Sequence, residues 1–268
     1  MQRLIILLFG LLSYAVFFAT FLYLVAFVGN LQHSGLVQWL PWLPELVPHS
    51  IDAGRETGVI GLALIVNLAL IALFGMQHSV MARTGFKAWL TRMLPASAER
   101  SFYVLLASVM LIVLFWQWRP IPMVIWEAQS TVGITLGWSV FALGFLLVLL
   151  STFLIDHFDL FGLKQVWSRF SNRSLPKPRF VTPMFYRLVR HPLYLGFILA
   201  FWAGPVMTVG GMLFAAAMTS YILIAIRFEE RDLVRILGPE YERYCDQVPM
   251  LVPGLNALSP AAREKELS

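Results

Sequence analysis

The sequence predicts an all-α polytopic membrane protein, with four full transmembrane helices, a C-terminal helical hairpin (five to six membrane segments in total) and cytoplasmic C-terminal helices. Composition is the first observation. Of the 268 residues, 59% are hydrophobic and only 13% are charged, whereas an ordinary soluble domain has about 25% charged residues. The second observation is a series of apolar runs close to the roughly 20 residues that a spanning helix needs. The third is the clustering of basic residues in alternate loops.

The four full spans correspond to apolar runs at residues 4–29, 57–76, 101–118 and 133–155. The first run begins after Arg3 and is too long for a secretory signal, and no small-residue cleavage site follows it, so we expect it to be retained. Six tryptophans lie near the predicted span ends, as in an interfacial aromatic belt. They are Trp39, Trp42, Trp89, Trp116, Trp118 and Trp126.

The last apolar stretch, residues 193–226, differs from the others because Val209-Gly210-Gly211 interrupts it. The interruption leaves two pieces of about sixteen residues, with Pro205 inside the first. Each piece is short for a full span, so the pattern predicts a tight or partly re-entrant hairpin. We find no internal repeat, and treat 1–268 as one domain: a four-span bundle at 1–155, then the hairpin and tail at 156–268.

Basic residues give the predicted orientation. Eighteen of the twenty Lys and Arg residues lie in the N-terminus, in the loops at 82–100 and 156–192, or after residue 226. By the positive-inside rule, both termini and these loops are cytoplasmic. The net charge of +5 is then a basic collar facing lipid headgroups, and predicts no nucleic-acid partner.

Two charged clusters flank the hairpin. The segment Arg-His-Pro-Leu-Tyr-Leu-Gly at 190–196 opens it, and Phe-Glu-Glu-Arg-Asp-Leu at 228–233 closes it, followed by Gly-Pro-Glu-Tyr-Glu-Arg-Tyr at 238–244. Cationic and dianionic groups at the two ends of one short hairpin imply a site for a polar ligand at the cytoplasmic membrane surface, because ionisable groups there need partners or water.

This compound pattern, over roughly residues 180–253, resembles the integral-membrane methyltransferases typified by isoprenylcysteine carboxyl methyltransferase and phospholipid N-methyltransferases. The resemblance implies that the hairpin and the helix after it hold S-adenosyl-L-methionine as cofactor. The residues implied to bind it are Arg190, His191, Tyr194, Gly196, Glu229, Glu230 and Tyr241.

Four further stretches, at 77–83, 99–105, 115–120 and 156–163, are similar to bacterial methanethiol S-methyltransferases and in part to NnrU-like membrane proteins. This resemblance implies an enzyme of the bacterial inner membrane that methylates a small volatile thiol, with methanethiol converted to dimethyl sulfide. Two alternatives stay open: methylation of a lipid or isoprenylcysteine substrate, and a non-catalytic NnrU-like protein. Oligomeric state is left open.

Thiol methylation needs a thiolate, because the thiol is a far poorer nucleophile. A base whose pKa lies near working pH would take the proton. Candidates near the cytoplasmic ends of the spans are His78, Asp156, His157 and Asp159. We favour the Asp156-His157 pair, because the fourth span leads directly into it. The alternative is structural: the two histidines as interface residues, and the two aspartates as partners of Lys164 or nearby arginines. No metal-ligand spacing recurs, so no metal site is predicted.

Overall fold

The structure is a computed structural model that describes residues 1–175 and 180–254. Five of its helices are long and apolar enough to cross a membrane: α1 (Gln2–Val28), α3 (Ile60–Ala82), α5 (Ala96–Gln117), α6 (Thr131–Ile155) and α10 (Val209–Leu237). A shorter apolar helix, α9 (Pro192–Trp202), precedes α10. The predicted fold class, an all-α polytopic membrane protein, is confirmed.

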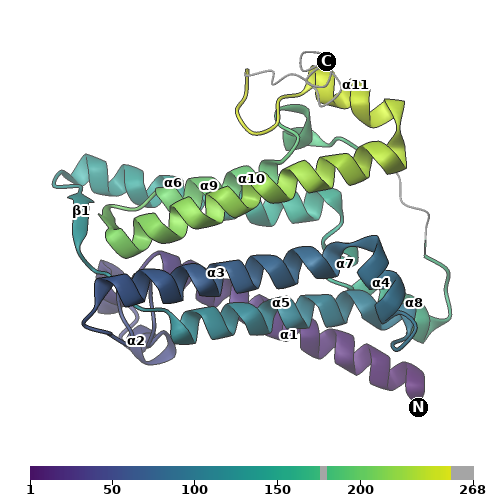
Figure 1. Cartoon of the computed structure of the whole chain (residues 1–268), viewed down its shortest axis with the longest axis horizontal. Coiled ribbons are helices and arrows are strands. Elements are labelled where there is room, and N and C mark those ends of the chain that lie inside the picture. Colours follow the sequence, from purple (N-terminus) through teal and green to yellow (C-terminus); the bar gives the residue numbers. More distant parts are fainter. Residues whose placement is uncertain (176–179, 255–268) are drawn as a thin grey trace.

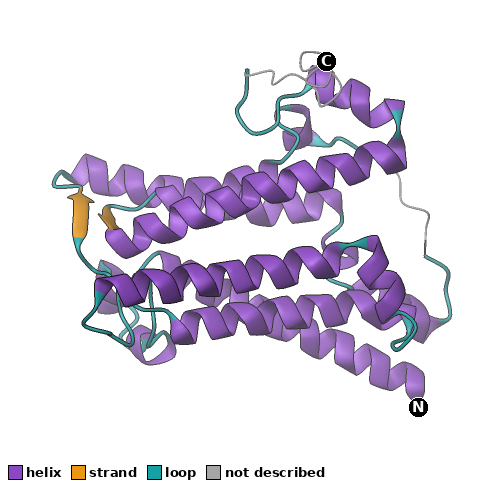
Figure 2. Ribbon diagram, viewed as in Figure 1, coloured by secondary structure: helices purple, strands orange, loops and turns teal. Residues whose placement is uncertain are grey.

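The long helices form two layers (Figure 1). Helices α6, α9 and α10 lie in one layer, and α1, α3 and α5 lie in the other, with α3 packed against α10 between them. Figure 2 shows that strand structure is confined to one end of the bundle, where β1 (Val124–Glu127) pairs antiparallel with β2 (Val206–Thr208). We call this end the strand end, and the opposite end, which carries residues 190–196, the motif end.

The hairpin is less symmetrical than predicted. Its break lies at residues 203–208, where Pro205 and β2 occupy the turn, and not at Val209-Gly210-Gly211, which is the first turn of α10. The Thr208 hydroxyl caps α10 by accepting a hydrogen bond from the Gly211 N–H, at 3.0 Å. Glycines are tolerated there because the first turn depends on its cap. Helix α10 therefore continues unbroken for 29 residues.

Helix α9 has only 11 residues, which is about 16 Å of helix against the roughly 30 Å of a bilayer core. Its depth follows from its contact with α6. A Cβ on Gly196 would lie 2.6 Å from the carbonyl oxygen of Gly144, and Gly144 also packs on Ala200. Because the two helices are antiparallel, this register places His191 close to the last turn of α6. The start of α9 is therefore set slightly inside the motif end.

The core is densest near the strand end, where aromatic rings from both layers meet. Phe27 packs against Phe115 and Trp118, and Trp118 packs against Phe214. Trp118 is only 1% exposed, and its indole N–H donates to the carbonyl oxygen of Ile51, at 3.0 Å. The belt prediction is therefore wrong for Trp118, because the chain turns inward after α5, while the other five tryptophans of the predicted belt are exposed.

Short helices surround the bundle. At the motif end these are α4 (Thr84–Leu90), α7 (His157–Leu160), α8 (Leu163–Ser171), η3 (Met184–Arg187) and α11 (Pro239–Gln247). At the strand end, the loop after α1 holds η1 (Leu31–His33), η2 (Gly35–Gln38) and α2 (Leu43–Leu46). Gly238, with φ +60°, separates α10 from α11. This left-handed residue lets the chain fold α11 back at the motif end.

Candidate functional site

A buried ionic cluster forms where the two ends of the hairpin meet. Glu230 of α10 is 6% exposed, and its Oε1 atom accepts hydrogen bonds from Arg190 Nε at 2.7 Å and from His191 Nε2 at 3.0 Å. Arg190 and His191 are equally buried. The structure thus brings together the charges that the sequence places 39 and 40 residues apart.

Arg190 also holds the tail against the hairpin. Its guanidinium donates to the carbonyl oxygens of Cys245, at 3.0 Å, and Val248, at 2.6 Å, which lie at the end of α11. The backbone N–H groups of Arg190 and His191 donate to residues 249 and 250. Although burial opposes the charged form, the contact with Glu230 raises the pKa of Arg190. Arg190 is thus a permanent cation that satisfies helix-end carbonyls.

The Glu229 side chain points in a different direction from that of Glu230, because successive side chains of a helix are about 100° apart. Its side chain is exposed, and its Oε2 atom accepts a hydrogen bond from the Tyr194 hydroxyl, at 2.8 Å. Tyr186 of η3 lies near the same carboxylate, and burial followed by this negative charge raises the pKa of Tyr186. Glu229 therefore presents a carboxylate at the surface of the cluster.

A second group of polar side chains comes from the opposite layer. The Tyr103 hydroxyl of α5 lies 2.7 Å from Nε2 of His78 of α3. Tyr221 of α10 completes the group: its ring fills the space over Gly75, where a Cβ would lie 2.8 Å from the ring, and its edge faces His78. Tyr221 belongs to the same helix as Glu229, and Arg83, which follows α3, pairs with Asp232 of that helix at 3.1 Å. The two layers therefore share one polar zone at the motif end.

Two atoms of this zone have unmet hydrogen-bonding capacity. Gln77 Oε1 and His78 Nδ1 are buried, and neither has a hydrogen-bond partner within residues 1–175 and 180–254. Buried polar atoms are almost always paired in native structures. His78 Nδ1 and the exposed Glu229 carboxylate give the zone acceptors that suit a ligand with hydroxyl, amino or ammonium groups. The methyl donor S-adenosyl-L-methionine carries hydroxyl, amino and ammonium groups, so the residues of the zone fit it.

The other three candidate bases lie among different neighbours. His157 is buried with both ring nitrogens engaged, Nε2 at 2.8 Å from the Tyr14 hydroxyl and Nδ1 at 2.8 Å from the Thr152 hydroxyl, and Phe153 stacks on its ring at 4.2 Å. Burial lowers the pKa of His157. Asp156 caps α7 and pairs with Lys164.

Asp159 accepts a hydrogen bond from Gln165, at 3.1 Å. Among the described residues, none of the partners of Asp156, His157 or Asp159 belongs to α9, α10 or α11. The structure therefore does not bring these three residues into the Glu230 cluster, and gives each a structural contact.

Two residues implied to bind the cofactor have packing roles. Gly196 faces α6, where a Cβ would overlap the backbone of Gly144. Tyr241 of α11 is 2% exposed, and burial raises the pKa of its hydroxyl. Its ring meets that of Phe180 edge-on, with centroids 5.8 Å apart. Both residues therefore pack against neighbouring helices or loops next to the Glu230 cluster.

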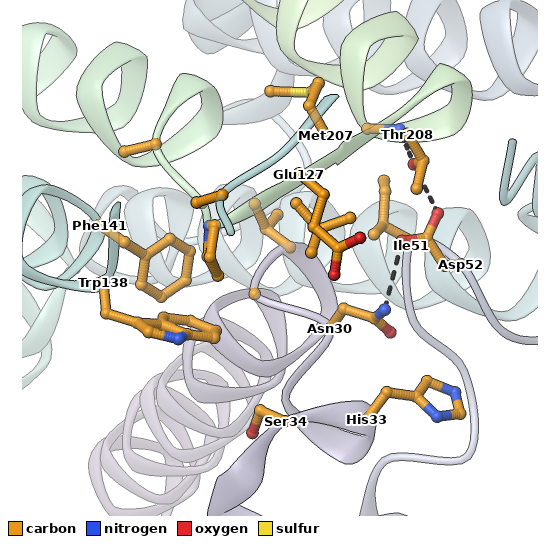
Figure 3. Close-up of a pocket in the computed structure, with 18 of the residues that line it drawn as sticks. Asn30, His33, Ser34, Ile51, Asp52, Glu127, Trp138, Phe141, Met207 and Thr208 are labelled. Atoms are coloured by element: carbon orange, nitrogen blue, oxygen red, sulfur yellow. Dashed lines mark hydrogen bonds between the residues drawn. The ribbon is translucent and has the colours of Figure 1, made fainter. Parts of the chain in front are cut away.

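A cavity of about 380 Å³ lies at the strand end, away from this zone. Figure 3 shows the rings of Trp138 and Phe141 on one side of it, and Asp52 and His33 on the other. Asp52 accepts hydrogen bonds from Thr208 at 2.6 Å and from Asn30 at 3.2 Å. These bonds tie the loop after α1 to β2. No group of three or more metal-ligating side chains occurs here or elsewhere in the described part of the chain.

Comparison with known proteins gives the family. The sequence matches the NnrU protein family over residues 66–231. Methanethiol S-methyltransferase 2 of Bradyrhizobium diazoefficiens is 50% identical to it over 255 residues, which are 95% of this chain and 92% of the relative. Methanethiol S-methyltransferase of Mycobacterium tuberculosis is 47% identical over 253 residues, 94% of this chain and 98% of the relative. The chain belongs to the methanethiol S-methyltransferase family.

A more distant relative is Nurim of Sus scrofa, 30% identical over 186 residues that cover 66% of this chain and 70% of the relative. No solved structure matches the chain.

The polar zone of this member of the methanethiol S-methyltransferase family contains tyrosines that sequence analysis did not single out. Tyr103 lies in the 99–105 stretch that resembles the family. Tyr186 and Tyr221 lie outside the three segments 190–196, 228–233 and 238–244. A signal for Tyr221 does exist in the sequence. Gly75 of a predicted span and Tyr221 of the predicted hairpin form a small–large pair, but pairing them requires knowing that α3 and α10 touch.

Proposed function

We propose that this protein transfers the methyl group of S-adenosyl-L-methionine to methanethiol and releases dimethyl sulfide. The observation that carries the proposal is membership of the methanethiol S-methyltransferase family over 95% of the chain. The polar zone at the motif end supports it, because this zone joins the residues of the methyltransferase-like motif to acceptors from the other layer.

The residues proposed to hold the cofactor are those at the surface of the cluster. Glu229 would accept hydrogen bonds from hydroxyl or ammonium groups, with Tyr194 fixing its direction. The ion pairs of Glu230 with Arg190 and His191 would hold the start of α9 against α10. When bound, S-adenosyl-L-methionine supplies an electrophilic methyl group that a thiolate sulfur can attack.

Of the four candidate bases, we propose His78 as the proton acceptor. In the tautomer that carries hydrogen on Nε2, the imidazole donates to the Tyr103 oxygen and leaves the Nδ1 lone pair free. Nδ1 is the buried atom without a partner in the described residues. The thiol proton would pass to Nδ1 as the thiolate forms, and Tyr103 would hold the ring in place.

The substrate assignment is tested by a headspace assay. Purified protein is incubated with S-adenosyl-L-methionine and a series of thiols, and dimethyl sulfide from methanethiol is the expected product. Methylation of a phospholipid or an isoprenylcysteine in place of methanethiol would contradict the proposed substrate. Failure to bind S-adenosylhomocysteine by calorimetry would contradict a cofactor role altogether.

The role of His78 is tested by His78→Gln, with His33→Gln in the loop after α1 as the matched control. We expect turnover to fall about 10²-fold or more, the usual contribution of a positioned base, while S-adenosylhomocysteine still binds. The variant should regain rate as pH rises, because more thiolate then forms without a base. Wild-type turnover in His78→Gln at neutral pH would remove His78 from the proton path.

A further inference from the structure

A basic hollow lies apart from the proposed catalytic zone, between the first turn of α5 and helix α8. Its volume is about 420 Å³. Two segments line it: the start of α5, and one side of α8 with the turn that follows. The lining includes Ala96, Ser97, Gln165, Arg169, Asn172 and Arg173.

The hollow favours a negative charge. Helix α5 begins at Ala96 after Pro95, and no side chain caps it. The Ala98 N–H donates to the Pro95 carbonyl oxygen, and the positive end of the helix dipole lies at this turn. Arg169 and Arg173 both line the hollow, and neither forms an ion pair within the described segments. The acidic residue of this turn, Glu99, does not line it.

Two buried atoms in the lining residues have no hydrogen-bond partner in the part of the chain that the structure describes. They are the Ser97 hydroxyl oxygen and Gln165 Oε1. The amide nitrogen of Gln165 already donates to Asp159, so only its oxygen is unsatisfied. A hydroxyl donates to phosphate, whereas an amide oxygen requires a donor. The expected ligand therefore combines a phosphate with a hydroxyl or ammonium group.

Helix α8 packs beside the lipid-facing start of α1. Val166 is fully buried against Gly10 of α1, where a Cβ would lie 2.6 Å from it. The two turns of α1 before Gly10 carry Leu4 and Ile5, 49% and 64% exposed, which need a lipid environment. On α8 itself, Trp167 is 56% exposed. This combination of one buried, one basic and one aromatic face is typical of an interfacial helix.

We propose that the hollow between α5 and α8 binds the headgroup of a membrane phospholipid, with its phosphate at the start of α5 between Arg169 and Arg173. The Ser97 hydroxyl donates to the phosphate. The Gln165 oxygen accepts from a hydroxyl or ammonium group of the same headgroup. Phosphatidylglycerol and phosphatidylethanolamine meet both requirements, whereas phosphatidylcholine has the phosphate but no donor.

Native mass spectrometry of the purified protein in detergent tests the site. Short-chain phosphatidylglycerol, phosphatidylcholine with the same chains, and inorganic phosphate are titrated separately. Wild type should retain one phosphatidylglycerol more tightly than phosphatidylcholine. The double variant Arg169→Ala, Arg173→Ala should bind it about thirtyfold more weakly, the effect of two basic side chains at an anionic surface. Arg243→Ala, an exposed arginine of α11, is the matched control and should bind like wild type.

The remaining arms separate the ligand sources and the failure modes. Competition by inorganic phosphate at equal concentration would identify free phosphate as the ligand of the same anion site. Ser97→Leu fills the hollow without removing charge and should also weaken phosphatidylglycerol binding. It therefore tests the site even if the double variant fails to fold. Equal phosphatidylglycerol affinity in wild type, Ser97→Leu and any folded arginine variant would overturn the proposal, as would equal loss in Arg243→Ala.

Discussion

At the scale of single residues, the two adjacent carboxylates of α10 perform different tasks. Glu230 is buried between Arg190 and His191, whereas Glu229 is exposed and paired with the Tyr194 hydroxyl. Both match the same motif, and the sequence treats them as one pair. They differ in burial: Glu230 is buried and Glu229 is exposed. A buried charge needs a partner of opposite charge to be stable, whereas an exposed charge is solvated by water.

We expect Glu230→Ala to destabilise the protein by about 3–5 kcal/mol, because it leaves the Arg190 guanidinium buried without its counter-charge. Glu229→Gln should leave stability nearly unchanged and weaken S-adenosylhomocysteine binding. Thermal unfolding in detergent and calorimetry measure the two effects. A Glu230→Ala protein as stable as wild type would show that the cluster does not hold the hairpin closed.

At the scale of helices, the contact between α6 and α9 sets the position of the motif. Gly144 and Gly196 let the two backbones approach closely, as small residues do at helix interfaces in membranes. The resemblance implied that Gly196 lines the cofactor. The structure gives it a packing role, through which it fixes where His191 and Tyr194 begin.

Substitution Gly196→Ala should therefore cost about 1–3 kcal/mol, the usual range for overpacking, and should lower turnover as the start of α9 shifts. Gly61→Ala in α3 is the matched control, since nothing lies within 4 Å of a Cβ there. Thermal unfolding and the headspace assay report both quantities. Equal stability and turnover of the two variants would mean that the α6–α9 contact has room for a methyl group.

The strand end contains an element with pH-dependent stability. Burial raises the pKa of Asp52, although Thr208 and the charge of His33 oppose this. Folding therefore favours the protonated carboxyl. Its contribution is complete below the unfolded value of about 4 and is lost as pH rises through the folded value.

We expect the free energy of unfolding of wild type to fall more than that of Asp52→Asn as pH rises from about 4. The asparagine cannot ionise and keeps a hydrogen-bond acceptor for Thr208. Glu56→Gln, an exposed carboxylate of the same loop, is the control and should follow wild type. Parallel pH profiles for wild type and Asp52→Asn would contradict a raised pKa.

At the scale of the whole molecule, the charge asymmetry predicts that the motif end faces the cytoplasm. Eighteen of the twenty basic residues fall in the sequence segments predicted to be cytoplasmic, and two fall in the alternate loops. The single native cysteine is a poor reporter of this orientation. Cys245 is 2% exposed, and burial raises the pKa of its thiol to about 11, so little reactive thiolate forms at neutral pH.

Orientation is better measured with exposed engineered cysteines in a Cys245→Ser background. Gln247→Cys lies at the last residue of α11 at the motif end, and Gln38→Cys lies in the loop after α1. A membrane-impermeant maleimide should label Gln38→Cys in intact cells, and Gln247→Cys only after the cells are opened. The reverse labelling pattern would mean that the protein has the opposite orientation in the membrane, with the motif end outside the cell.

The sequence by itself determined the fold class, four of the five long spans and the residues of the hairpin motif, because these depend on local hydrophobicity and on charge counted along the chain. It misplaced the hairpin break, since the Thr208 cap that begins α10 and the β1–β2 pairing both depend on distant partners. Its candidate bases included both His78 and His157, and it favoured the Asp156-His157 pair. Only the tertiary structure separated them, because whether a buried ring nitrogen has a partner is decided by other helices: Tyr14 satisfies His157, while Nδ1 of His78 has none in the described residues.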